Sequence, residues 1–120
     1  MGVQEIKGNR SMTLDDLARK VKEGIKRKQI VVGKERFENM ARRQEIGLVW
    51  FTTDLSKSAF HNMWKTCKKR QIKVIYAGYS EDIGEITGLE NCKVYVFKKS
   101  FSGLKEFISD IPEEFIAWED

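Results

Sequence analysis

The chain has 120 residues, of which 41% are apolar and 33% are charged, and its formal net charge at pH 7 is +4. This length and apolar share suit one compact domain, which we expect to cover residues 1–120. No apolar run approaches the roughly 20 residues that a membrane-spanning helix needs. Residues 1–11 resemble a loose leader and match neither a secretory signal nor a myristoylation motif, so we expect a cytoplasmic protein.

Basic and acidic residues are unevenly distributed. The first 104 residues contain 21 bases and 12 acids, whereas residues 105–120 contain one Lys and six acids. A basic body with an acidic C-terminal extension, here residues 112–120, fits a polyanionic partner, most often a nucleic acid. The alternative is an ordinary solvated surface that has no such partner.

The first predicted helix begins after Thr13, because Thr13 and Asp16 match a capping box. Apolar residues then recur at helical spacing up to Ile25. Residues 30–32 form a short predicted strand that ends at Gly33. The next helix has an inner face of three residues: Phe37, Met40 and Ala41.

Residues 48–51 form the second predicted strand, and their consecutive apolar side chains indicate burial on both faces of the sheet. Asp54 or Ser56 can cap the third helix. The buried stripe predicted for this helix consists of Phe60, Met63, Trp64 and Cys67.

The last third of the chain repeats the alternation of strands and helices. Strands are predicted at residues 73–77 and 94–97, and a short helix between them is expected to end at Gly88 in a left-handed cap. An amphipathic helix over residues 101–111 is terminated by Pro112. The sequence therefore predicts a three-layer α/β/α sandwich, with about four strands in the sheet and helices on both faces.

The sequence contains little that resembles catalytic chemistry. His61 is the only histidine and lies within a predicted helix, and neither Cys67 nor Cys92 has a motif that would activate a thiol. No spacing of acids or cysteines indicates a metal site, and no glycine-rich motif indicates a nucleotide cofactor. We expect no cofactor, and enzyme activity is the least favoured interpretation.

The turn at Gly33 carries the clearest indication of binding. The start of a helix offers free amides and the positive end of the helix dipole, both suited to a phosphate. Lys34 and Arg36 add positive charge, and Gly33 lets a nucleic-acid backbone approach without a Cβ in the way. The alternative is that Gly33 is only a turn residue between a strand and a helix.

Three stretches of sequence, taken together, resemble the ribosomal L7Ae/L30e superfamily of small kink-turn RNA-binding proteins. They are VVGKERFENMARRQEIGLVWFTTDLS, FHNMWKTCKKRQIKVIYAGYSEDIGEITGL and ENCKVYVF. The resemblance covers about residues 14–111, and the bacterial members look most similar. It implies an α/β/α sandwich and a structured RNA partner, with ribosomal RNA as one candidate.

The resemblance also implies a set of contact residues at the turn. In the superfamily this turn has Gly, a small residue, Asn and Glu, followed three residues later by Lys. In this chain these positions are occupied by Gly33, Lys34, Glu35, Arg36 and Asn39. An ionised Glu35 only accepts hydrogen bonds, whereas Asn both donates and accepts, so this position departs from the kink-turn pattern.

The second contact implied by the resemblance is the loop before the last strand, which is usually apolar and packs on extruded bases. Here Glu90 and Asn91 make it more polar. Two functions follow: an RNA-binding protein that uses this turn and loop, or a protein-interaction module that keeps the scaffold and has lost the RNA face. The aromatic pair Phe60 and Trp64 is interpreted as core, and the basic run from Lys65 to Arg70 as a solvated helix face.

Overall fold

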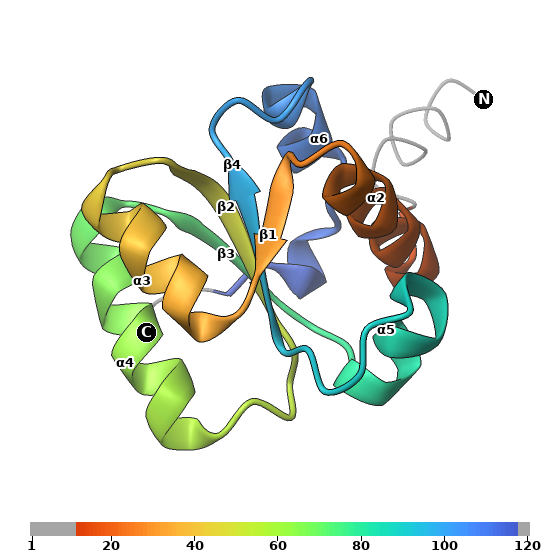
Figure 1. Ribbon diagram of the computed structural model, residues 1–120, viewed down its shortest axis with the longest axis horizontal. Coiled ribbons are helices and arrows are strands. Elements are labelled where there is room, and N and C mark those ends of the chain that lie inside the picture. The colour runs from red at the N-terminus through yellow and green to blue at the C-terminus, as the bar shows by residue number, and fades with distance from the viewer. Residues whose placement is uncertain (1–11, 118–120) are drawn as a thin grey trace.

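The computed structural model describes residues 12–117, which form a four-stranded mixed sheet and five α-helices (Figure 1). The helices are α2 (Leu14–Lys26), α3 (Lys34–Arg42), α4 (Lys57–Arg70), α5 (Ser80–Thr87) and α6 (Leu104–Asp110). The strands are β1 (Ile30–Val32), β2 (Ile46–Phe51), β3 (Lys73–Tyr76) and β4 (Val94–Lys98). The leader predicted over residues 1–11 lies outside the described residues.

The sheet has the strand order β1-β4-β2-β3. Strand β4 is antiparallel to both β1 and β2, whereas β2 and β3 are parallel. The C-terminal ends of β1, β2 and β3 therefore meet the start of β4 at one edge of the sheet. This edge, at the bottom of Figure 1, consists of residues 33–36, 52–57, 77–82 and 88–93, and we call it the Gly33 edge.

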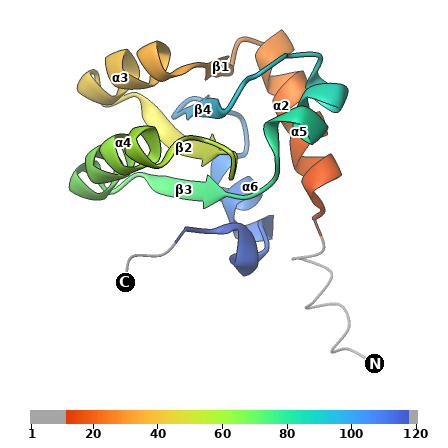
Figure 2. The ribbon, with the colours of Figure 1, turned by 90° about the horizontal axis from the view of Figure 1, so that it is seen from below.

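Two hydrophobic cores lie on opposite faces of the sheet. Leu48 and Trp50 of β2 face the core formed with α2, α5 and α6, and Val49 and Phe51 face the core formed with α3 and α4. All four side chains are fully buried. Figure 2 shows α3 and α4 on one side of the sheet and α2 and α5 on the other. The predicted three-layer α/β/α sandwich is confirmed.

The local signals of the sequence account for most helix starts. Helix α2 has the predicted capping box: the Thr13 hydroxyl accepts from the Asp16 amide at 3.1 Å, and the Asp16 carboxylate accepts from the Thr13 amide at 3.0 Å. Ser56 is the cap of α4, because its hydroxyl accepts from the amide of Ala59 at 3.2 Å. Asp54, the alternative cap, contacts a different helix.

Two predicted boundaries are wrong, one by two residues and one by three. Strand β2 begins at Ile46, because the strand continues through an irregularity at Gly47 that interrupts the apolar run. Helix α6 begins at Leu104, because Gly103 is left-handed at φ 70°. Phe101 precedes that helix and packs against Phe97, with ring centroids 5.2 Å apart.

The C-terminal segment lies along the outer side of β3. After Pro112, residues Glu113–Phe115 form a 3-10 helix. Ile116 then bridges to Ile75, and the amide of Ala117 donates to the carbonyl of Val74 at 2.9 Å. Trp118 lies outside the described residues. Within residues 12–117, no helix is long and apolar enough to cross a membrane.

Candidate nucleic-acid interface

The turn at Gly33 has a backbone conformation that is nearly restricted to glycine, with φ 104° and ψ 154°. A Cβ at this position would have no atom within 4 Å, so the space in front of the turn is open. The carbonyl of Gly33 accepts the first helical hydrogen bond of α3, from Phe37, at 3.0 Å. The three preceding amides, those of Lys34, Glu35 and Arg36, therefore have no acceptor within the helix.

The side chains of the first turn of α3 are exposed. Among the described residues, Lys34, Glu35 and Arg36 make no ion pair and no side-chain hydrogen bond. They stand at the positive end of the helix dipole, where free amides and two cations favour an anion and one carboxylate opposes it. The turn can bind a phosphate group, but Glu35 reduces its positive potential.

Asn39, the fifth residue of the predicted contact set, is exposed one turn further along α3. Its side-chain oxygen accepts a hydrogen bond from the guanidinium of Arg42 on the same helix. The side-chain oxygen of Asn39 is thus bonded to a residue nearer the C-terminus of α3. Only its side-chain NH2 group remains available to donate a hydrogen bond to a partner.

The loop before β4 lies directly beside this turn. The amide of Gly33 donates to the carbonyl of Val94 at 3.0 Å, and the amide of Thr52 donates to the carbonyl of Lys93 at 3.1 Å. Glu90 and Asn91 are both exposed in this loop, and Asn91 is left-handed at φ 56°. Gly33 and the end of this loop, far apart in sequence, are therefore joined at the start of β4, and both belong to the Gly33 edge.

The loop is held in place from both of its ends. The hydroxyl of the buried Tyr95 donates to the carbonyl of Cys92 at 3.2 Å, and burial raises the pKa of this phenol, so it stays protonated. At the other end, Gly84 of α5 packs against the loop so closely that a Cβ there would lie 2.5 Å from the carbonyl oxygen of Leu89. Only glycine fits at that contact.

Asp54 joins three segments of the Gly33 edge, and sequence reasoning missed this role. Its carboxylate accepts from the amide of Ser80 at 3.0 Å and from the Ser80 hydroxyl at 2.6 Å, and so caps α5 from another part of the chain. The Lys93 ammonium lies 3.9 Å away. Burial raises the pKa of Asp54, but hydrogen bonds to its carboxylate, first among them those from Ser80, together outweigh burial and hold that pKa below its ordinary value.

A hollow of about 750 Å³ opens between α5 and the loop. Its lining includes four carboxylates: Asp54, Glu81, Glu85 and Glu90. Tyr79 also lines it with a side chain that is 54% exposed, although no motif in the sequence selects this residue. An exposed aromatic ring beside a polar loop can stack on an unpaired base, whereas the carboxylates repel phosphates.

The residues considered for catalysis are not arranged for it. Cys67 is fully buried, and burial raises the pKa of its thiol to about 12, so it is not a thiolate at neutral pH. Burial also raises the pKa of Cys92. His61 is exposed on α4. Among residues 12–117, no group of three or more metal-binding side chains is clustered.

Two solved structures are similar to this chain over most of its length. A protein of unknown function from Bacillus halodurans C has a TM-score of 0.67 and 18% identity, and the match covers 78% of this chain and 94% of that one. The Giardia lamblia 15.5kD RNA binding protein has a TM-score of 0.69 and 17% identity, with 85% of each chain covered. At such identities the likeness shows a common α/β/α fold.

The family is shown by the sequence itself. The model of the Ribosomal protein L7Ae/L30e/S12e/Gadd45 family matches residues 15–108, and the chain belongs to this family. Among curated proteins, none matches the chain significantly. The family resemblance stated from the sequence is thereby confirmed.

Proposed function

We propose that this protein binds structured RNA at the Gly33 edge. Family membership supports an RNA partner, and the similar Giardia protein is described as RNA-binding. The observation that carries the proposal is the hydrogen bond from the Gly33 amide to Val94 at the start of β4, because the loop of residues 88–93 ends directly beside the α3 turn at that point.

In this proposal the two parts of the surface have different tasks. The free amides at the start of α3, with Lys34 and Arg36, hold phosphates, so affinity falls as salt rises. The loop at Glu90 and Asn91, together with the exposed ring of Tyr79, contacts unstacked bases. RNA shape then decides which molecules fit.

A more specific form of this proposal is that the bound RNA contains a kink-turn. Glu35 can accept hydrogen bonds from base amino groups, but it cannot donate the hydrogen bonds that an Asn would provide. We therefore expect a kinked RNA whose contacted bases present donors at this position. A ribosomal RNA in the cytoplasm is the natural candidate, and no catalytic step is part of the proposal.

The second candidate is a protein-interaction module on the same scaffold. The four carboxylates around the hollow at α5 favour it, because this part of the edge suits a cationic protein segment better than a phosphate. This function would use the α5 side of the edge and leave the Gly33 turn unoccupied.

Binding to a panel of RNAs separates the two candidates. Purified protein is titrated with a kink-turn RNA, a stem-loop and an unstructured RNA at two salt concentrations. We expect selective, salt-sensitive binding to the kinked RNA, which the double variant Lys34→Ala, Arg36→Ala weakens about tenfold or more, since each phosphate contact contributes about 1 kcal/mol. Equal, weak binding to all three RNAs would overturn the proposal and favour a protein partner.

A further inference from the structure

Three helix-to-strand turns share one short sequence pattern. KRKQI (residues 26–30), RRQEI (residues 42–46) and KRQI (residues 69–72) each place cations before a Gln and an Ile. Each turn also contains a left-handed residue: Lys28 at φ 61°, Gln44 at φ 59° and Gln71 at φ 59°. The pattern recurs after α2, α3 and α4.

The three turns meet at the edge of the sheet opposite the Gly33 edge, at the top and upper left of Figure 1. The end of β4 lies between them, because the amide of Lys98 donates to the carbonyl of Gln29 at 3.0 Å and that of Lys99 to the carbonyl of Glu45 at 2.9 Å. We call residues 26–29, 42–45, 68–71 and 98–99 the basic edge.

The basic edge has a high density of positive charge. Its 14 residues include ten Lys and Arg and a single acid, Glu45. Nine of the ten cationic residues are exposed, and Lys98 is half-buried. The four strands span about 14 Å at the usual interstrand spacing, so the charges cover a continuous strip.

Helix dipoles explain only part of this charge. Cations in the last turns of α2, α3 and α4 stabilise the negative helix ends. Lys98, however, is the last residue of β4, Lys99 follows that strand, and Lys28 stands beyond the end of α2. None of these three lysines lies in the final turn of a helix, where the helix dipole would account for it.

A hollow of about 320 Å³ opens in the middle of the basic edge. Lys69 and Arg70 of α4 line it together with Lys99 and Gln44, above an apolar floor that includes Ile46. Among residues 12–117, Lys69, Arg70 and Lys99 make no ion pair. Their charges are therefore available to an external anion.

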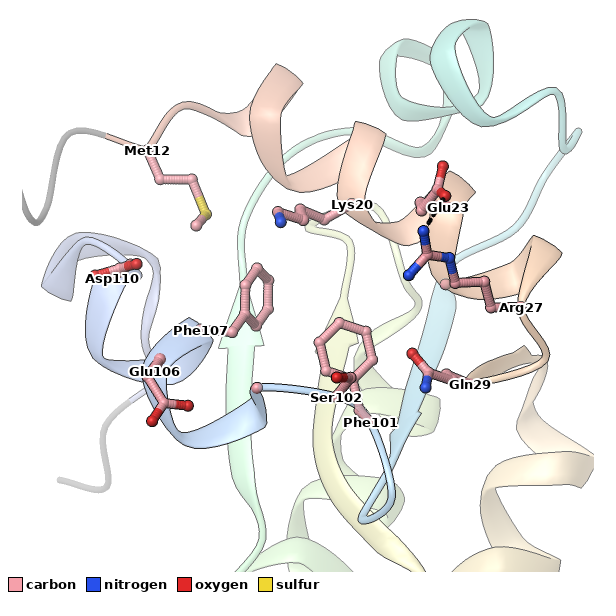
Figure 3. A pocket seen from close by; sticks show the side chains of 12 residues that line it. Met12, Lys20, Glu23, Arg27, Gln29, Phe101, Ser102, Glu106, Phe107 and Asp110 are labelled. Carbon is pink, nitrogen blue, oxygen red and sulfur yellow. Dashed lines mark ion pairs between the residues drawn. The ribbon is translucent and has the colours of Figure 1, made fainter.

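The basic edge ends at α2, where a second hollow separates it from α6 (Figure 3). There Arg27 is paired with Glu23 at 3.1 Å, and Glu106 and Asp110 line the α6 side. The charge available to a partner therefore lies toward α3, α4 and β4.

We propose that the basic edge is a second RNA-binding surface, and that it holds the sugar-phosphate backbone of an RNA helix. This inference rests on the RNA-binding function proposed above and adds a surface on the opposite side of the molecule. The large hydrophobic side chains that are exposed among the described residues, Tyr76 and Tyr79, lie outside the basic edge. A surface that has no exposed aromatic side chains contacts RNA through its phosphates and not through its bases. Binding at the basic edge is therefore independent of the RNA sequence.

The test measures the binding of the full chain to a plain RNA duplex and to a kink-turn RNA flanked by the same duplex. The edge variant carries Lys69→Gln, Arg70→Gln and Lys99→Gln, and the matched control carries Lys20→Gln, Lys22→Gln and Lys65→Gln, which lie on exposed helix faces. Both lose three charges. Thermal unfolding of each variant verifies that it folds.

We expect the edge variant to bind the plain duplex at least tenfold more weakly, with a shallower dependence of log affinity on log salt, and the control to change less than threefold. Equal losses in the two variants would overturn the inference. The inference would also be overturned if the edge variant bound the duplex as the wild type does but no longer bound a polyglutamate peptide. In that case the basic edge would bind an acidic protein. A failure of the Gly33-edge proposal would give a different result. In that case the wild type would bind the kinked and the plain RNA equally, whatever the affinity of the edge variant.

Discussion

The two edges of the sheet have the same backbone elements and opposite chemistry. The Gly33 edge contains four bases and five acids, whereas the basic edge contains ten bases and one acid. At the Gly33 edge the segments are tied together by Asp54 and the Val94 carbonyl, with an exposed ring nearby. The Gly33 edge, with its fixed segments and exposed ring, suits contacts to bases and RNA loops. The basic edge, with its many cations, suits contacts to phosphates.

The composition predicts an excess of positive charge, and the comparison of the two edges shows where that charge lies. The net charge of the chain, +4, suggests a modest attraction to RNA. The structure concentrates the positive charge on the side opposite the predicted contact residues. A partner that reaches both edges would gain selectivity from one and affinity from the other.

The largest effect on the Gly33 edge is expected from Gly84→Ala. The new Cβ would lie 2.5 Å from the carbonyl oxygen of Leu89, so α5 and the loop must separate. We expect a loss of about 2–3 kcal/mol in the free energy of unfolding, measured by urea denaturation. The neighbouring exposed Glu85→Ala serves as control and should change stability by less than about 0.5 kcal/mol. Equal stability of the two variants would show that the loop is not packed on Gly84.

Asp54→Asn tests how much the charge of Asp54 stabilises the Gly33 edge. It removes the charge that accepts two hydrogen bonds from Ser80, so we expect a loss of about 2 kcal/mol at pH 7. Because the folded state lowers the pKa of Asp54, its stabilisation is complete above the ordinary value of 3.8 and is lost as pH falls through the lower folded value. The wild type and the variant should therefore converge in stability once the pH falls below the folded-state pKa of Asp54. A constant difference at all pH values would contradict this role.

The smallest predicted effect concerns the basic edge. Gln71→Gly should raise the free energy of unfolding by up to about 1 kcal/mol, because glycine adopts φ 59° without strain. Gln29→Gly, at a turn position without a positive φ, should not stabilise the protein. Thermal denaturation compares the two. A loss of stability in Gln71→Gly would mean that its side chain contributes more than its backbone costs.

The sequence was sufficient for the layers of the fold. The consecutive apolar residues of β2 require cover on both faces of the sheet, and the capping box at Thr13 defines the start of α2. Both signals are local, and both are confirmed. The predicted contact at residues 33–39 and 90–91 stays a prediction, although the structure brings Gly33 beside the loop.

The remaining features depend on contacts between distant segments. Asp54 reaches Ser80 only because β2 and β3 are parallel and end at the same edge, and a sequence does not state how strands pair. The sequence predicts that the basic residues between Lys65 and Arg70 form one solvated helix face. Lys69 and Arg70 lie near Lys99 because β4 occupies a central position in the sheet. No spacing along the chain predicts this proximity.

The most direct test of the account is a lysine-acetylation footprint of the protein bound to a kink-turn RNA with a flanking duplex, read by mass spectrometry. We predict that bound RNA protects Lys34 at the Gly33 edge and Lys69 and Lys99 at the basic edge, while Lys22 and Lys65 react as in the free protein. Unchanged reactivity of Lys34 under saturating RNA would contradict the central claim that this edge binds RNA.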